Sequence, residues 1–123
     1  MKLDSQRKPR ILIVEDEPMI ALDLEDMLAD ADFEIAGVAA TLETALHFIE
    51  NRSFDAALLD ANLNGTSAAP AAAALQARSL PYVVLSGYST GQQPPALRQA
   101  VVLTKPVDPA LVVQALRNIL PVP

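Results

Sequence analysis

The stretch Ile11-Leu12-Ile13-Val14-Glu15-Asp16 is an unbroken apolar run that ends in two carboxylates. A second run, Ala56-Ala57-Leu58-Leu59, ends in the same way at Asp60. Short apolar runs without polar alternation are typical of strands buried on both faces of a parallel sheet. If the two runs are such strands, three carboxylates meet at one edge of the sheet. Carboxylates a few Å apart repel by about 4 kcal/mol at an effective dielectric constant of ~20, so this cluster requires a cation or a raised pKa.

Apolar runs alternate with stretches of helical period along the whole chain. Strands are expected at about residues 10–15, 33–39, 54–59, 82–85 and 101–104. Helices are expected to begin near Pro18, Thr41, Ser67, Pro95 and Asp108, and the helix near Pro95 must be short because glycines and prolines precede it. Alternating strands and helices are typical of repeated βα units. We therefore expect one α/β domain over residues 1–123, with a core at about 10–120 and a doubly wound parallel sheet covered by helices on both faces.

Apolar residues at helical spacing identify the faces that these helices bury. In the first helix the expected face is Ile20, Leu24, Met27, Leu28 and Ala31. The second helix presents Leu42, Ala45, Leu46 and Ile49, with Thr41 as its N-cap. Asn64-Gly65 marks a turn before the third helix. Asp108-Pro109 predicts an N-cap and a first-turn proline for the last helix, whose face is Leu111, Val112, Ala115, Leu116 and Ile119.

The composition excludes several classes of function. The chain carries 9 basic and 15 acidic residues, for a net charge of −6, and its basic residues are scattered, so direct nucleic-acid binding is not expected. Cysteine is absent, which excludes disulfides, thiolate metal sites and a cysteine nucleophile. No apolar run approaches the length of a membrane span or of a signal peptide, and we expect a soluble cytoplasmic protein.

Four of the five expected strands are followed by polar residues that could share one pocket. Glu15 and Asp16 follow the first strand, Asp60 the third, Ser86 the fourth and Lys105 the fifth. In a doubly wound sheet, ligands bind beyond the carboxyl ends of the strands. Hard oxygen ligands in a wet cleft suit Mg²⁺, with Asp16 and Asp60 as direct ligands. Asp60 can then act as a nucleophile towards a phosphoryl group, whose oxygens Lys105 and Ser86 would contact.

With these residues in place, the chain resembles the receiver domain of two-component response regulators over nearly its whole length. Glu15-Asp16 resembles the family's metal-binding acidic pair, Asp60 its phosphoacceptor, Ser86 its switch hydroxyl, and Lys105-Pro106 its lysine and following proline. The resemblance implies a flavodoxin-like strand order 2-1-3-4-5, a cis bond before Pro106 and a Mg²⁺ ligand from the backbone carbonyl of Asn62. It also implies that the phosphohistidine of a histidine kinase phosphorylates Asp60, and that the hydroxyl of Ser86 then moves towards the phosphate.

Two positions depart from the family's pattern. Val102 stands three residues before Lys105, where the family usually has an aromatic residue that flips inward in the switch. Ser86-Gly87-Tyr88, followed by a shortened and proline-interrupted crossover, is similar to the Thr-Gly-aromatic signature of stand-alone receivers known chiefly from alphaproteobacterial stress signalling. The resemblance thus implies a switch or partner surface formed by Ser86, Gly87, Tyr88, Val102 and Pro106.

The residues leave three functions open. The leading hypothesis is a phosphorylation-dependent switch, a monomer or weak dimer that signals through protein contacts and turns over no separate substrate. A phosphatase of the haloacid dehalogenase type also uses an aspartate nucleophile and Mg²⁺, but it has an Asp-x-Asp pattern after its first strand, which Glu15-Asp16-Glu17 lacks. The third is a constitutive interaction module that is never phosphorylated. Val102 favours it, whereas the retained acids and Lys105 oppose it.

Overall fold

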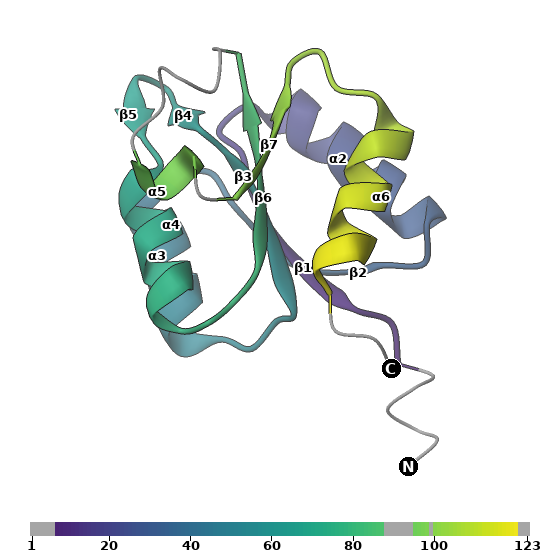
Figure 1. The fold of residues 1–123 in the computed structure, drawn as a ribbon, viewed down its shortest axis with the longest axis horizontal. Helices are drawn as coiled ribbons and strands as arrows, with labels where there is room; N and C mark the ends of the chain where they lie inside the picture. The colour runs from purple at the N-terminus through teal and green to yellow at the C-terminus, as the bar shows by residue number, and fades with distance from the viewer. Residues whose placement is uncertain (1–6, 88–94, 99, 121–123) are drawn as a thin grey trace.

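A parallel β-sheet forms the centre of the molecule. The computed structural model describes residues 7–87, 95–98 and 100–120. The five strands of the sheet lie in the order β2-β1-β3-β6-β7. They are Arg10–Val14 (β1), Glu34–Ala39 (β2), Ala56–Asp60 (β3), Tyr82–Ser86 (β6) and Val101–Thr104 (β7), and neighbours pair in parallel. The order implied by the resemblance is confirmed, with β2 at one edge and β7 at the other (Figure 1).

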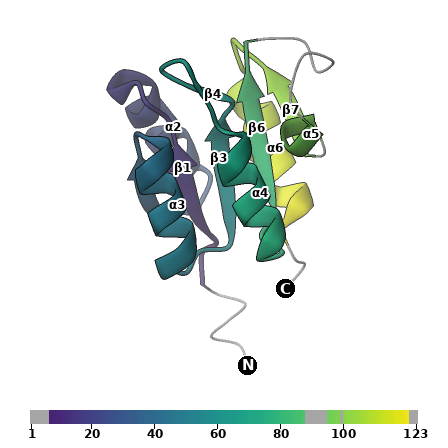
Figure 2. The same ribbon diagram turned by 90° about the vertical axis from the view of Figure 1, so that its left-hand side faces the viewer.

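Helices cover both faces of this sheet. Their bounds are Pro18–Asp30 (α2), Leu42–Asn51 (α3), Ala69–Ala77 (α4), Pro95–Arg98 (α5) and Pro109–Ile119 (α6). Figures 1 and 2 show α2 and α6 on one face of the sheet and α3, α4 and α5 on the other. The doubly wound α/β fold and the short helix near Pro95 are therefore confirmed. None of the helices in the described part of the chain is both long and apolar enough to cross a membrane.

The central strands face two hydrophobic cores at once, which explains their unbroken apolar sequences. In β1, Leu12 and Val14 pack with residues of α3 and α4, whereas Ile11 and Ile13 pack with residues of α2 and α6. All four residues are at most 1% exposed. Because successive residues of a strand point to opposite faces, a strand buried on both sides needs an apolar residue at every position.

Local signals start α3 and α6 where the sequence predicts them. The hydroxyl of Thr41 accepts a hydrogen bond of 3.1 Å from the backbone N–H of Thr44, which caps α3. The carboxylate of Asp108 caps α6 by accepting from the N–H of Ala110 at 2.9 Å.

The prediction that Leu111 is buried is wrong, since this residue is 51% exposed. It lies in the first turn of α6, four residues before the buried Ala115 on the same side of the helix.

A small hairpin follows β3, where only a turn was expected. β4 (Asn62–Leu63) pairs antiparallel with β5 (Thr66–Ser67) around Asn64-Gly65. Both turn residues have a positive φ, 53° for Asn64 and 89° for Gly65, as a type I′ hairpin turn requires. Helix α4 consequently begins at Ala69 and not at Ser67, because Ser67 is paired with Asn62.

Candidate functional site

Three carboxylates meet at the carboxyl ends of two neighbouring strands. β1 and β3 pair in parallel with Val14 opposite Leu59, so Glu15 and Asp60 occupy adjacent strand ends. Asp16 follows directly, and carboxylate oxygens of Glu15, Asp16 and Asp60 lie within 4.8 Å of one another. The expected meeting of these acids is confirmed.

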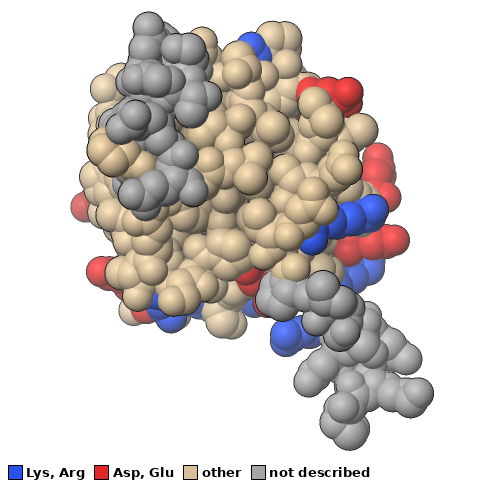
Figure 3. All heavy atoms as spheres, in the orientation of Figure 1, with Lys and Arg blue, Asp and Glu red and all other residues tan. Residues whose placement is uncertain are grey.

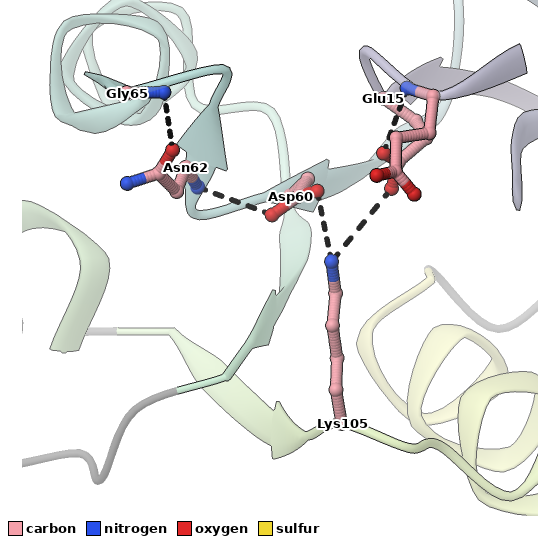
Figure 4. A network of polar contacts seen from close by, with 6 residues as sticks. Glu15, Asp60, Asn62, Gly65 and Lys105 are labelled. Atoms are coloured by element: carbon pink, nitrogen blue, oxygen red, sulfur yellow. Dashed lines mark hydrogen bonds and ion pairs between the residues drawn. The ribbon is translucent and has the colours of Figure 1, made fainter.

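Lys105 reaches the same point from the end of β7. Its backbone N–H donates a 2.8 Å hydrogen bond to the carbonyl of Ser86, which fixes the chain just after the strand. Its ammonium Nζ lies 2.9 Å from Oδ2 of Asp60 and 4.0 Å from Oε1 of Glu15 (Figure 4). One cation therefore faces two of the three carboxylates.

The carboxylate of Asp60 is held by donors from two different parts of the chain. Its Oδ2 accepts from the ammonium of Lys105, and its Oδ1 accepts a 3.1 Å hydrogen bond from the backbone N–H of Asn62. The residue is only 5% exposed. Because both oxygens have a defined partner, the carboxylate is oriented by the protein itself, which is what a reacting group needs.

Glu15 is the most deeply buried acid of the site, with 1% exposure. Its Oε2 accepts a 3.1 Å hydrogen bond from the N–H of Glu17, and its Oε1 has no hydrogen-bond partner among the residues that the structure describes. Burial raises the pKa of Glu15 from 4.5 to about 7. The N–H of Glu17 and the charge of Lys105 oppose this rise, and the neighbouring Asp60 adds to it.

The acids act on Lys105 in turn. Burial of Lys105 by itself would lower its pKa, but the hydrogen bond and charge of Asp60, joined by the charges of Glu15 and Glu17, raise the pKa above its ordinary 10.5. Lys105 is therefore charged at neutral pH, and its charge compensates part of the negative charge of the acids.

The oxygen atoms gathered here fit a small divalent cation. Mg²⁺ prefers carboxylate oxygens and keeps several of its waters, so a partly open cleft suits it. The buried Oε1 of Glu15 is an oxygen that still needs a positive partner, because a buried polar atom without one is costly. Among the described residues, Glu15, Asp16 and Asp60 thus form an acidic triad consistent with a Mg²⁺ site.

A cleft of about 460 Å³ lies at Asp16 and Asp60, two of the three acids of the triad. The residues that line it are Asp16, Glu17, Asp60, Ala61, Asn62, Asn64, Ser86, Gly87 and Lys105. Of the residues predicted to form the switch or partner surface, Ser86 and Gly87 reach the cleft and Val102 and Pro106 do not. Val102 is partly buried and packs against the core on the side of α3 and α4, whereas Pro106 is exposed and follows Lys105 through a cis peptide bond. Tyr88 lies outside the described residues.

A larger groove lies between α2 and α6. Its volume is about 1420 Å³, and its apolar lining includes Ile20, Leu24, Met27, Val107 and Val113. Lys105 borders both the cleft and this groove. Asp16, Asp60 and Ser86 border the cleft but not the groove, and Glu15 borders neither of the two. Convergent polar groups with shifted pKa values identify a reactive site better than volume does, so the smaller cleft is the candidate functional site.

Comparison with known proteins places this arrangement in a family. The family described as the response regulator receiver domain matches residues 11–117. The chain belongs to this family. The matched region of the receiver domain contains the whole acidic triad as well as Ser86 and Lys105.

Similar regions occur in longer proteins. The sensor protein GacS of Pseudomonas syringae pv. syringae is 29% identical in an alignment of 114 positions that covers 85% of this chain and 12% of GacS. This receiver domain therefore spans only a small part of that curated relative.

Solved structures of similar chains share the receiver fold. The solution structure of SdrG from Sphingomonas melonis Fr1 is 41% identical, with a TM-score of 0.77 over 91% of this chain and 96% of SdrG. The BeF3-activated conformation of SdrG, from Pseudomonas melonis Fr1, is 42% identical, with a TM-score of 0.76 over the same shares of 91% and 96%. The receiver domain of the sensor histidine kinase PA1611 from Pseudomonas aeruginosa PAO1 has a magnesium ion in its active site cleft. It shares the fold at 24% identity, with a TM-score of 0.77 over 90% of this chain and 96% of that receiver domain.

Three lining residues of the cleft, Glu17, Ala61 and Asn64, were not predicted. Glu17 lies beside Glu15 and donates its backbone N–H to it. Asn64 reaches the cleft because the hairpin of β4 and β5 folds beside Asp60. The Asn-Gly pair at the tip is a strong hairpin signal, and it was the one feature of the sequence that could have revealed this hairpin.

Proposed function

We propose that this chain is a phosphorylation-dependent signalling switch that accepts a phosphoryl group on Asp60 and acts through contacts with other proteins. The observation that carries the proposal is the oriented Asp60 carboxylate, 2.9 Å from the ammonium of Lys105 and beside two further acids. Membership in the receiver family supports it, and so does the activated conformation solved for SdrG.

The proposed reaction is a displacement at phosphorus. An oxygen of Asp60 forms the new O–P bond while the P–N bond of a kinase phosphohistidine breaks, and the departing histidine keeps the electron pair of that bond. Lys105 balances the charge on the phosphoryl oxygens, and the hydroxyl of Ser86 donates a hydrogen bond to one of them. Slow hydrolysis of the acyl phosphate resets the switch. The chain is thus a stoichiometric phosphoacceptor that assists its own phosphorylation and dephosphorylation.

The proposed ligands of Mg²⁺ are Glu15, Asp16, Asp60 and the backbone carbonyl of Asn62. When bound, the ion would offset the negative charge of the acids and of the phosphoryl group. The hairpin supports the assignment of the carbonyl. Leu63 and Thr66 flank the two-residue turn, and in such a hairpin the flanking residues are joined by backbone hydrogen bonds to each other. The N–H and C=O of Asn62, which precedes Leu63, therefore point away from β5. The N–H of Asn62 bonds Asp60 at 3.1 Å, on the side where the carbonyl is needed.

The proposed switch involves the ends of β6 and β7. A phosphoryl group adds a charge of about −1.5 to −2 at pH 7. This charge shifts a conformational equilibrium only if it is contacted differently in two states. Ser86 and Lys105 are the groups that would make those contacts, and a 2.8 Å backbone hydrogen bond links them. The proposed switch or partner surface comprises Ser86, Gly87, Tyr88, Val102 and Pro106.

The proposed partners are a sensor histidine kinase and a downstream protein that recognises the phosphorylated form. The chain would act in the cytoplasm as a monomer or weak dimer, without membrane attachment. Direct binding of nucleic acid is not part of the proposal, because the net charge is −6. On the face shown in Figure 3, the basic side chains are scattered near the rim and interspersed with acidic ones.

Intact-mass measurement after incubation with Mg²⁺ and a small phosphodonor such as acetyl phosphate tests the proposal. Wild type should gain one phosphoryl group and Asp60→Asn none. Asp26→Asn, which removes an exposed acid of α2, is the matched control and should be labelled like wild type. Unlabelled wild type, or undiminished labelling of Asp60→Asn, would contradict the proposal. Rapid turnover of a generic phosphomonoester would favour the phosphatase instead.

A further inference from the structure

Asn62 makes one hydrogen bond through its backbone and another through its side chain. The backbone N–H donates to Oδ1 of Asp60 at 3.1 Å, and the side-chain Oδ1 accepts from the backbone N–H of Gly65 at 2.7 Å. Figure 4 shows the side chain turned towards Gly65 and away from Asp60. The side chain thus ties the hairpin together while the backbone of the same residue faces the reactive carboxylate.

The base of the hairpin is anchored independently of Asn62. The N–H of Ala61 donates to the carbonyl of Leu85 at 2.9 Å, and the N–H of Ala68 donates to the carbonyl of Ala61 at 2.9 Å. Leu63, at 3% exposure, fixes the hairpin to the core. The tip at Gly65 is exposed, and its N–H points back to Asn62. The bond between Gly65 and Asn62 therefore adds a constraint at the end of the hairpin that borders the cleft.

We propose that the side chain of Asn62 is a positioning group for the metal site. By holding Gly65, it restricts the rotation of the Asn62 peptide units, whose N–H orients Asp60 and whose carbonyl faces the same side. A backbone ligand that is restricted before binding loses less conformational entropy when the ion arrives. The inference rests on the proposed function, and it gives the side chain of Asn62 a role separate from that of its carbonyl.

Loss of this constraint should weaken Mg²⁺ binding although no ligand is removed. Groups that hydrogen-bond behind a metal ligand typically change metal affinity by about 10-fold or more. For Asn62→Ala we therefore expect about 10-fold weaker Mg²⁺ binding, together with faster hydrogen exchange at the amide of Gly65. Asn62→Val fits a strand and likewise offers no acceptor, so it carries the same expectation should Asn62→Ala fail to fold.

Three control variants distinguish the positioning role of the Asn62 side chain from the effect of an added charge and from the effect of any change at the edge of the cleft. Asn62→Asp keeps an oxygen that can accept from Gly65, so slow exchange at the Gly65 amide should be retained. The negative charge that Asn62→Asp adds should by itself tighten Mg²⁺ binding. Asn64→Asp measures this effect of charge, because it places a carboxylate at another position that lines the cleft. Asn64→Gly removes a side chain that lines the cleft but tolerates the positive φ of the turn, so its Mg²⁺ affinity should stay within about twofold of wild type.

The measurements are a calorimetric Mg²⁺ titration and amide hydrogen exchange, both on unphosphorylated protein. The inference is overturned if Asn62→Ala binds Mg²⁺ within about twofold of wild type, or if its Gly65 amide remains as protected as in wild type. It is also overturned if Asn64→Gly weakens binding as much as Asn62→Ala does. A wild type that binds Mg²⁺ but accepts no phosphoryl group would refute the proposed function alone, and the titrations would still decide the role of Asn62.

Discussion

The ammonium group of Lys105 lies 2.9 Å from Oδ2 of Asp60, although the strands that carry these residues are not neighbours. β6 separates β3 from β7 in the sheet, and the long lysine side chain bridges the gap. The same ammonium lies 4.0 Å from Oε1 of Glu15. Lys105 thus stabilises a group of acids that would otherwise repel one another.

Replacing Lys105 with methionine should slow phosphorylation of Asp60. The change keeps most of the side-chain length but removes the charge that faces the phosphoryl oxygens, and loss of one such donor typically costs about 10²-fold in rate. Phosphorylation by a small phosphodonor, followed by intact mass over time, measures the effect. Lys8→Met removes the same charge at an exposed position and should react like wild type. A Lys105→Met variant that reacts at the wild-type rate would remove Lys105 from the proposed chemistry.

Glu15→Gln should stabilise the metal-free protein at pH 8. The folded state raises the pKa of Glu15 from 4.5 to about 7, so it binds the proton more tightly than the unfolded chain does. This contribution to stability is fully present below pH 4.5 and is lost as the pH rises through 7. Each pKa unit corresponds to about 1.4 kcal/mol, so a rise from 4.5 to about 7 makes the difference at pH 8 about 3 kcal/mol in favour of the variant. Urea denaturation in a chelator at pH 4 and pH 8 measures it, and parallel pH profiles for both proteins would contradict the prediction.

The affinity for Mg²⁺ should fall at acidic pH. A carboxyl group must lose its proton before it binds a metal, and Glu15 has a pKa of about 7 in the metal-free protein. The apparent affinity at pH 6 should therefore be about tenfold lower than at pH 8. Calorimetric titration at both pH values provides the measurement. Glu15→Gln should bind more weakly overall and show a flatter pH dependence, so an equally steep profile in that variant would assign the effect to another group.

Gly37→Ala should destabilise the fold by overpacking the face between β2 and α3. A Cβ atom at this position would lie closer to Cε2 of Phe48 than two non-bonded carbon atoms can approach. Overpacking of this kind typically costs about 1 to 3 kcal/mol. Urea denaturation measures the loss, and Gly37→Ala combined with Phe48→Leu should recover part of it. Gly87→Ala is the control, because its Cβ meets no atom of the described residues within 4 Å. Equal urea midpoints for Gly37→Ala and wild type would contradict the packing argument.

The elements of the fold could be predicted because their signals are local. Ile11, Leu12, Ile13 and Val14 are all apolar since each packs into one of two cores, and this pattern identifies a doubly covered strand without any knowledge of its neighbours. Thr41 and Asp108 start their helices through hydrogen bonds to residues two or three positions away. Leu111 shows the limit of such reasoning, since helical spacing does not say where along a helix the sheet begins.

The sequence by itself determined which residues end the strands, and hence which acids, hydroxyl and lysine were available for a site. Only the tertiary structure decided that Lys105 meets Asp60, 45 positions earlier in the chain, that Oε1 of Glu15 is buried without a hydrogen-bond donor among the described residues, and that Asn62 is tied to Gly65. The physical reason is that strand order and register bring these side chains together. Order and register result from packing helices on both faces of the sheet, which is a property of the whole chain and not of any one segment.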